Sequence, residues 1–180
     1  MTIKIYENDQ IYVRPFVKSD ITERYLEWFQ DQEVCKYNSH GKMSNKPTLA
    51  INNNMDDSIG WAVISKYSVH AGTTYYSDHL IGKVKLEINW INRNAEFTCI
   101  FGEKEFWGKG YCTQVLKWII DHSLNKLNLH KIWLGTAESN TGMLKAADKA
   151  GMNCEACLHS EVFLNGKFEN VLRWGIFKDK

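Results

Sequence analysis

The chain has 180 residues, of which 44% are hydrophobic and 24% are charged, with 22 basic and 21 acidic side chains and a formal net charge of +1. This size and composition predict a single folded domain over 1–180 and exclude a disordered chain. The balanced charge and the lack of a basic run argue against nucleic acid as a partner.

No apolar run reaches the length of a signal-peptide core or a membrane span, so we expect a cytoplasmic protein with no membrane partner. The five cysteines are irregularly spaced, which favours reduced thiols over a disulfide framework. Cys154 and Cys157 have the gap of a metal-binding pair, but no second pair accompanies them, so we interpret them as two positions on a strand. No metal is expected.

Alternating and helical apolar patterns predict the elements of the first half of the chain. They are a strand at 11–16, a helix at 21–29 capped by Ser19 or Asp20, a poor helix at 47–55, and strands at 59–67, 80–90 and 95–101. The polar segment 68–79 is predicted to be a hairpin loop. The polar and aromatic segment 36–42 has the composition of a loop that contacts a ligand.

The apolar pattern and turn residues of the second half of the chain predict a strand–helix–strand crossover followed by a helix and a hairpin. A helix at 111–127 carries an apolar stripe, and a strand at 131–136 follows it, so the strands on either side of this helix must be parallel. A helix at 140–150 ends at Gly151, and Asn165-Gly166 marks a hairpin turn within 161–177. The fold class is therefore α/β (α+β), with a mostly antiparallel mixed sheet flanked by helices.

A glycine turn lies between the strand that ends at Phe101 and the helix that begins at Tyr111. Gly108 and Gly110 leave the backbone N–H groups and the helix N-terminus open to an anion such as pyrophosphate. A nucleotide-triphosphate loop would need Ser or Thr after a Gly-Lys pair, and a dinucleotide loop would need a third glycine where Thr113 stands. The first alternative fails on spacing, and the second is weak.

The segment from Glu105 to Gly110 resembles the acyl-CoA pyrophosphate loop of the GCN5-related N-acetyltransferase (GNAT) superfamily, Gln/Arg-x-x-Gly-x-Gly/Ala, with Glu105 at its first position. The segments 28–34 and 140–152 also resemble superfamily motifs. The likeness covers nearly the whole chain and is closest to the branch of ribosomal-protein N-terminal and amino-sugar acetyltransferases. It implies acetyl-CoA as the acyl donor.

The same resemblance implies that the fourth and fifth strands separate around the pantetheine arm, at the parallel crossover. The residues implied in cofactor binding are Cys99, Ile100, Phe101, Trp107, Gly108, Lys109, Gly110, Tyr111, Cys112, Thr113, Asn140 and Lys149. Asn140 also fits a helix N-cap. Met143 and Ala147 depart from the motif, and Ala147 stands where many members carry the Tyr that protonates the leaving thiolate.

Acetyl transfer to an amine needs a base, because the amine is mostly protonated at neutral pH, and it needs donors for the oxyanion. We expect Glu96 to be the base, with Glu87 and then His40 as alternatives; Glu96 could equally be an exposed strand residue paired with a lysine. Asn38 and His40 are candidates for substrate contact or for solvated loop positions. No residue is assigned as the general acid.

Three functions remain open. The first is acetyl transfer to a small amine, for which the loop from Tyr37 to Gly41 suggests a nucleotide-linked amino sugar of surface-polysaccharide synthesis. The second is transfer to a protein N-terminus, and the third is a non-catalytic acyl-CoA-binding module. The chain could be a monomer or a homodimer.

Overall fold

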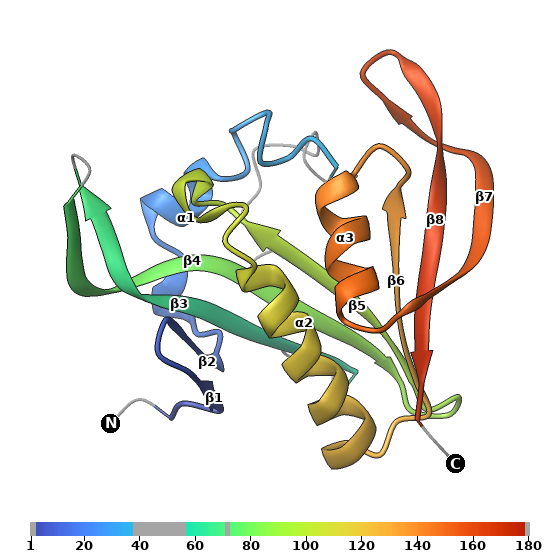
Figure 1. The fold of residues 1–180 in the computed structure, drawn as a ribbon, viewed down its shortest axis with the longest axis horizontal. Coiled ribbons are helices and arrows are strands. Elements are labelled where there is room, and N and C mark those ends of the chain that lie inside the picture. The colour runs from blue at the N-terminus through green and yellow to red at the C-terminus, as the bar shows by residue number, and fades with distance from the viewer. Residues whose placement is uncertain (1–2, 38–56, 71–72, 179–180) are drawn as a thin grey trace.

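The computed structural model describes residues 3–37, 57–70 and 73–178, and these form an eight-stranded sheet with the order β1-β2-β3-β4-β5-β6-β8-β7. The strands are β1 (Tyr6–Glu7), β2 (Ile11–Pro15), β3 (Ser58–His70), β4 (Thr73–Asn89), β5 (Asn94–Phe101), β6 (Lys131–Ala137), β7 (Asn153–Leu164) and β8 (Lys167–Phe177). Every neighbouring pair is antiparallel except β5 with β6 (Figure 1). Asn38, His40 and the predicted helix at 47–55 lie outside the described residues.

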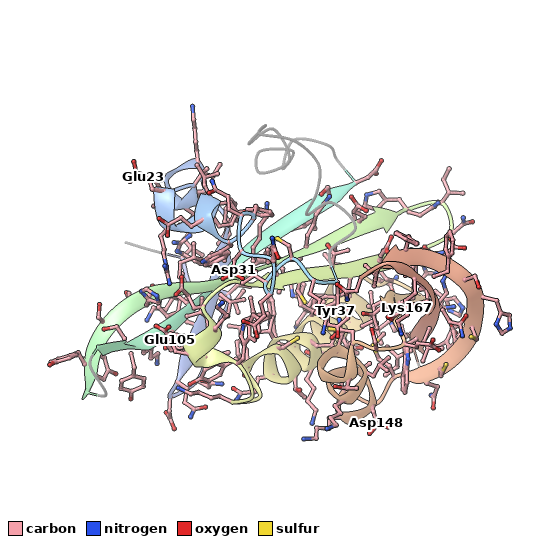
Figure 2. The ribbon with its side chains drawn as sticks, turned by 90° about the horizontal axis from the view of Figure 1, so that it is seen from above. Glu23, Asp31, Tyr37, Glu105, Asp148 and Lys167 are labelled. Atoms are coloured by element: carbon pink, nitrogen blue, oxygen red, sulfur yellow. The ribbon has the colours of Figure 1, made fainter. Side chains whose placement is uncertain are left out.

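Helices cover both faces of the sheet. Helices α2 (Tyr111–Asp121) and α3 (Thr141–Lys149) lie on one face, and α1 (Glu23–Glu27) lies on the other (Figure 2). The larger apolar core lies under α2, and a smaller aromatic cluster that includes Phe16, Tyr25 and Trp28 lies under α1. No helix in the described part of the chain is long and apolar enough to cross a bilayer.

The first helix is shorter than predicted, and its cap is different. Thr22 is the N-cap, with its side chain accepting a hydrogen bond from the Tyr25 N–H, so neither Ser19 nor Asp20 has this role. Asp20 is buried, and its carboxylate is bound by both terminal nitrogens of Arg14 and by the Val17 N–H. The prediction was wrong because Asp20 fixes the preceding turn, the 3₁₀ helix η1 (Lys18–Asp20), instead of the helix.

The predicted loop at 68–79 is also wrong, because β3 and β4 continue through it as a long hairpin. Ser68 pairs with Tyr75 and Tyr67 with Tyr76, and the Tyr67 and Tyr76 rings lie 5.0 Å apart in an edge contact. Register shifts after Val63 and after Ser65 interrupt the alternation of side chains. Threonine and tyrosine favour strands, but the bulges hide the twofold pattern on which the prediction relied.

The crossover and the C-terminal hairpin are confirmed. Helix α2 ends at Asp121 and runs into a π-helical turn, η4 (His122–Lys126), before β6. Gly151, after α3, has a φ of 86°, and Asn165 and Gly166 have φ values of 49° and 83° in the β7–β8 turn. Cys154 and Cys157 lie exposed on β7, as the strand interpretation predicts.

Candidate active site

The parallel strands β5 and β6 pair over a short distance and then separate. Their ladder joins Asn94–Glu96 to residues 131–133, and the pairing stops at Glu96 and Trp133. Beyond this point β5 stays with β4 and β6 stays with β8, so the two strands diverge toward their carboxyl ends (Figure 1). The backbone groups of Cys99, Ile100 and Phe101 lie along β5 beyond the end of this ladder, and their contact with pantetheine stays a prediction.

The glycine turn stands at the start of α2, next to the end of β5. Gly108 and Gly110 have φ values of 73° and 81°, and a Cβ built on either residue meets no atom within 4 Å. Gly110 is the N-cap of α2 and supplies no side-chain hydrogen bond to the first turn. The N–H groups at this helix end are therefore open to an anion, with the positive end of the helix dipole behind them.

The residues around the turn hold it against the sheet. The Trp107 indole N–H donates to the Phe101 carbonyl at 2.8 Å, so that carbonyl is already engaged at the end of β5. Tyr111 is buried, with its ring 6.2 Å from that of Phe106, and the Lys109 ammonium lies 5.1 Å from the centre of the Phe106 ring. The turn is thus tied to β5 on one side and packed into the core on the other.

The structure brings Asn140 toward this region but leaves Lys149 away from it. Asn140 is the N-cap of α3. Its side-chain oxygen Oδ1 accepts from the Met143 N–H at 3.3 Å, and its side-chain nitrogen Nδ2 donates to the Thr136 hydroxyl at 2.9 Å. Lys149 is the last residue of the same helix and is exposed, about 13 Å further along the helix axis. A cofactor contact for either residue remains a prediction.

Sulfur-containing side chains lie where α2, α3 and β5 meet. The Cys112 sulfur is 4.0 Å from the Met143 sulfur, so the first turn of α2 contacts the first turn of α3. A hydrogen bond to Cys112 and burial raise the pKa of the Cys99 thiol well above its usual value. Thr113 is half-buried on α2, and Ala147 is fully buried and brings no hydroxyl to this region.

The predicted base lies on the opposite face of the sheet, in a row across four strands. Ser58 pairs with Glu87, Glu87 with Glu96, and Glu96 with Trp133. Cross-strand partners share a face, and these residues line a pocket of about 360 Å³ together with Asp57, Ile88, Asn89 and Asn94. The pocket therefore carries three carboxylates and lies where β5 and β6 begin to separate.

The carboxylates of this pocket differ in their surroundings. Burial, and then the nearby Glu87 charge, raise the pKa of the half-buried Glu96, against a weaker opposing effect of Arg173 and Lys85. Arg173 lies over the Trp133 ring, 4.2 Å from its centre. Glu87 is more exposed and forms an ion pair with Lys85 on the same strand. Glu96 thus has the environment of a base, and Glu87 that of a surface charge.

Three features of the site were not predicted from the sequence. Trp133 joins the pocket through the register of β5 with β6, and Asp57 joins it just before β3, where its backbone carbonyl accepts from the Ile88 N–H; no local sequence signal indicates either position. Tyr37, at the edge of the predicted ligand-contact loop, donates its hydroxyl to the Ser139 carbonyl at 2.9 Å, just before α3. This contact ties the described start of that loop to the carboxyl end of β6.

The chain matches the family model described as the acetyltransferase (GNAT) domain over residues 10–153. It is 39% identical over 103 residues to a spermidine N(1)-acetyltransferase of Vibrio cholerae, covering 57% of this chain and 59% of that protein. It is 37% identical over 98 residues to the Escherichia coli spermidine N(1)-acetyltransferase, covering 54% of this chain and 52% of that protein. The chain therefore matches little more than half the length of these curated relatives.

A crystal structure of the V. cholerae spermidine N-acetyltransferase in complex with CoA and spermine superimposes with a TM-score of 0.73 at 27% identity, covering 95% of this chain and 97% of that one. These relatives differ from the branch that the motifs suggested, since none of the three is named for an amino sugar or a protein N-terminus. The family model covers most of the chain and the fold agrees with it. The chain belongs to the GNAT acetyltransferase domain family.

Proposed function

We propose that this protein transfers the acetyl group of acetyl-CoA to a primary amine of a polyamine, in a ternary complex. The observation that carries the proposal is the pocket at the start of the β5–β6 split, which places Asp57, Glu87 and Glu96 beside Trp133. The glycine turn at the start of α2 supports binding of the CoA pyrophosphate. The named relatives support the choice of acceptor.

In the proposed reaction, the amine nitrogen attacks the thioester carbonyl carbon while Glu96 accepts a proton from the nitrogen, directly or through water. A raised pKa suits Glu96 to this role, because its carboxylate then holds a proton closer to neutral pH. An N–H of β5 would stabilise the oxyanion. The C–S bond then breaks and the thiolate of CoA leaves. Ala147 offers no proton to it, so the thiolate takes its proton from solvent.

A polyamine suits the pocket because its ammonium groups are separated by short alkyl chains. One amine can lie neutral at Glu96 while a second, charged amine lies near Asp57 or Glu87 and the alkyl chain contacts Trp133. Lys85 does not close the pocket to a cation, because the Glu87 side chain with which it pairs is 52% exposed and ion pairs open to solvent are weak. A nucleotide-linked sugar would instead bring phosphates toward these carboxylates, which is unfavourable.

The acceptor is tested by comparing initial rates on spermidine, spermine, a monoamine of similar length, a nucleotide-linked amino sugar and an N-terminal peptide. We expect the polyamines to have the highest kcat/KM. Asp57→Asn and Glu87→Gln should each raise the KM for spermidine about fivefold, the loss of roughly 1 kcal/mol of charge interaction. Glu161→Gln, on exposed β7, is the control and should leave this KM unchanged.

Preference for the sugar or the peptide would refute the polyamine acceptor while leaving acetyl transfer intact. Binding of acetyl-CoA without turnover on any amine would instead favour the non-catalytic module. An unchanged spermidine KM in both pocket variants would show that the polyamine lies elsewhere.

The base is tested separately by Glu96→Gln, which keeps the shape of the side chain and removes its ability to accept a proton. We expect kcat/KM to fall by about 10²–10⁴-fold. In the wild type, kcat/KM should rise with pH as Glu96 loses its proton, at a higher pH than for an ordinary glutamate because its pKa is raised. This inflection should disappear in Glu96→Gln, which should keep only the later rise that comes from deprotonation of the amine itself. A profile that keeps this inflection would assign the base to another group.

A further inference from the structure

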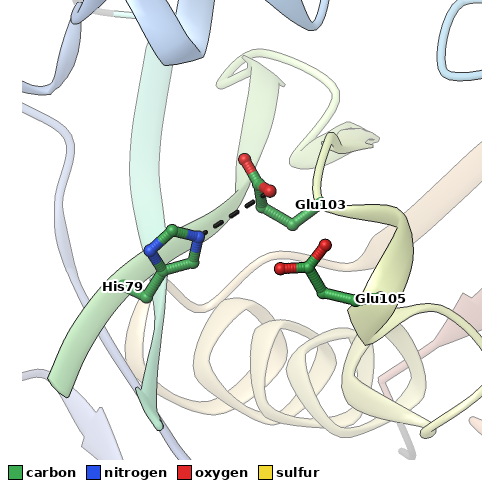
Figure 3. Close-up of side chains that lie close together, drawn as sticks. All are labelled: His79, Glu103 and Glu105. Atoms are coloured by element: carbon green, nitrogen blue, oxygen red, sulfur yellow. Dashed lines mark ion pairs between the residues drawn. The ribbon is translucent and has the colours of Figure 1, made fainter. Parts of the chain in front are cut away.

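A second cluster of side chains lies beside the glycine turn and is distinct from the carboxylate pocket. It contains His79 on β4, Glu103 just after β5, and Glu105 on the 3₁₀ helix η3 (Lys104–Phe106). One donor atom from each side chain lies within 4.8 Å of the other two. Figure 3 shows the imidazole and the two carboxylates facing a common space.

Glu103 is a fixed and buried member of this cluster, with 1% of its surface exposed. Its Oε1 accepts from Arg24 Nε and from the Trp28 indole N–H, both at 2.8 Å, and its Oε2 accepts from Arg24 Nη2 at 2.7 Å. A carboxylate has about four acceptor positions, so Oε2 keeps one that is unused by these donors. Hydrogen bonds of this kind orient a carboxylate that ligates a metal.

His79 faces the free side of Glu103. Its Nε2 is buried, has no hydrogen-bond partner among the described residues and lies 3.7 Å from Glu103 Oε2. This separation is too long for a hydrogen bond, and it is an ion-pair contact when the imidazole is protonated (Figure 3). Two donors that bind one zinc-sized ion at about 2.1 Å each lie about 3.4 Å apart in a tetrahedral arrangement, so 3.7 Å is close to a ligand spacing.

The imidazole is also held in place by its neighbours. Its ring stacks on Phe106, with the centroids 5.8 Å apart and the planes at 25°. Glu105 is exposed, so its carboxylate can move toward the imidazole without disturbing the core. The cluster therefore combines two oriented donors with one adjustable donor, and a solvent molecule could supply a fourth.

From this geometry we infer that His79, Glu103 and Glu105 form a binding site for a divalent first-row transition-metal ion. One imidazole nitrogen and two carboxylate oxygens suit Zn²⁺, Co²⁺ and Mn²⁺. Arg24 already balances the charge of Glu103, and the Glu105 charge remains to offset part of the charge of the ion. Bound metal would join β4 to the segment just before Gly108, and so would restrain the base of the glycine turn.

The inference is tested by titrating the purified chain, without a histidine tag, chelator or CoA, with Co²⁺. Visible absorption reports the ion, and thermal unfolding reports its effect on stability. We expect one equivalent bound through nitrogen and oxygen and a rise in Tm, because the ion binds the folded state. Both effects should be lost in Glu105→Gln and in His79→Asn.

Two matched variants serve as controls. Glu161→Gln and His159→Asn change exposed side chains of the same types on β7 and should bind Co²⁺ as the wild type does. Strong thiolate-to-cobalt absorption would place the ion on cysteines such as Cys154 and Cys157 and would overturn the inference. Retained binding in Glu105→Gln, or no binding to the wild type, would also overturn it. Glu105 is exposed, so its variant tests the site even if His79→Asn fails to fold.

Discussion

Replacing Gly110 with Asp should weaken acetyl-CoA binding by at least about 100-fold, or roughly 3 kcal/mol, as measured by titration calorimetry. The N–H groups of the first turn of α2 are open because Gly110 has no side chain, and the space around its missing Cβ is empty. An aspartate would fill this space with a negative charge, where the proposed ligand carries a pyrophosphate. It would also have to adopt a φ of 81°, which a side chain disfavours.

Gly166→Asp separates these causes. Gly166 has a φ of 83° and, like Gly110, no atom within 4 Å of the position that a Cβ would take, but it lies in the β7–β8 turn. The substitution brings the same charge and the same backbone strain, about 1–2 kcal/mol, and should leave acetyl-CoA affinity unchanged. Equal loss of affinity in both variants would mean that the effect is one of stability, and normal affinity in Gly110→Asp would refute the proposed pyrophosphate site at the glycine turn.

The second large effect is expected on folding. Glu103→Ala should lower the free energy of unfolding by about 3 kcal/mol in urea denaturation, because it removes the hydrogen bonds that the buried carboxylate accepts from Arg24 and Trp28. It also leaves the Trp28 indole N–H without its acceptor. The surrounding side chains support the charged form of Glu103: burial alone would raise its pKa, but His79, Arg24 and Trp28 lower it to about 2.

Glu27→Gln is the matched control, because Glu27 pairs with the same Arg24 at 3.3 Å but lies on the surface, with 60% of its side chain exposed. Exposed ion pairs contribute little, so we expect no measurable change in stability. If the two variants were equally stable, the Arg24–Glu103 pair would have no special role in joining α1 to the end of β5.

The crossover and the hairpin could be predicted because local signals agree there with the tertiary structure. The apolar stripe of α2 faces the core, and Gly151 and Gly166 stand at positive φ, where a glycine is favoured. The predictions failed where tertiary contacts outweigh local pattern. Asp20 has the residue type of a helix cap, but its carboxylate binds Arg14 instead. The bulges in the β3–β4 hairpin disrupt the alternating pattern by which strands could be predicted within a polar segment.

The site was predictable in part for the same reason. Gly108 and Gly110 have positive φ values, which the local backbone of the turn requires and which favour glycine. A short sequence motif is therefore enough to predict the turn. The neighbours of Glu96 come from three other strands and depend on register, which sequence spacing does not reveal without the pairing. The role of Glu103 is harder still to predict from the sequence, because its partners Arg24 and Trp28 lie 79 and 75 residues away in the chain.

The short ladder between β5 and β6 has a mechanical consequence. Among the described strands, β1–β5 form one part of the sheet and β6–β8 form the other, and the main-chain bonds between these parts stop after Glu96 and Trp133. Antiparallel hydrogen bonding stabilises each part internally. Bending of the sheet should therefore concentrate where β5 and β6 stop pairing. A ligand whose amides pair with the open edge of β5 would act as a replacement strand, and its departure would leave the two parts free to rock about the remaining pairs.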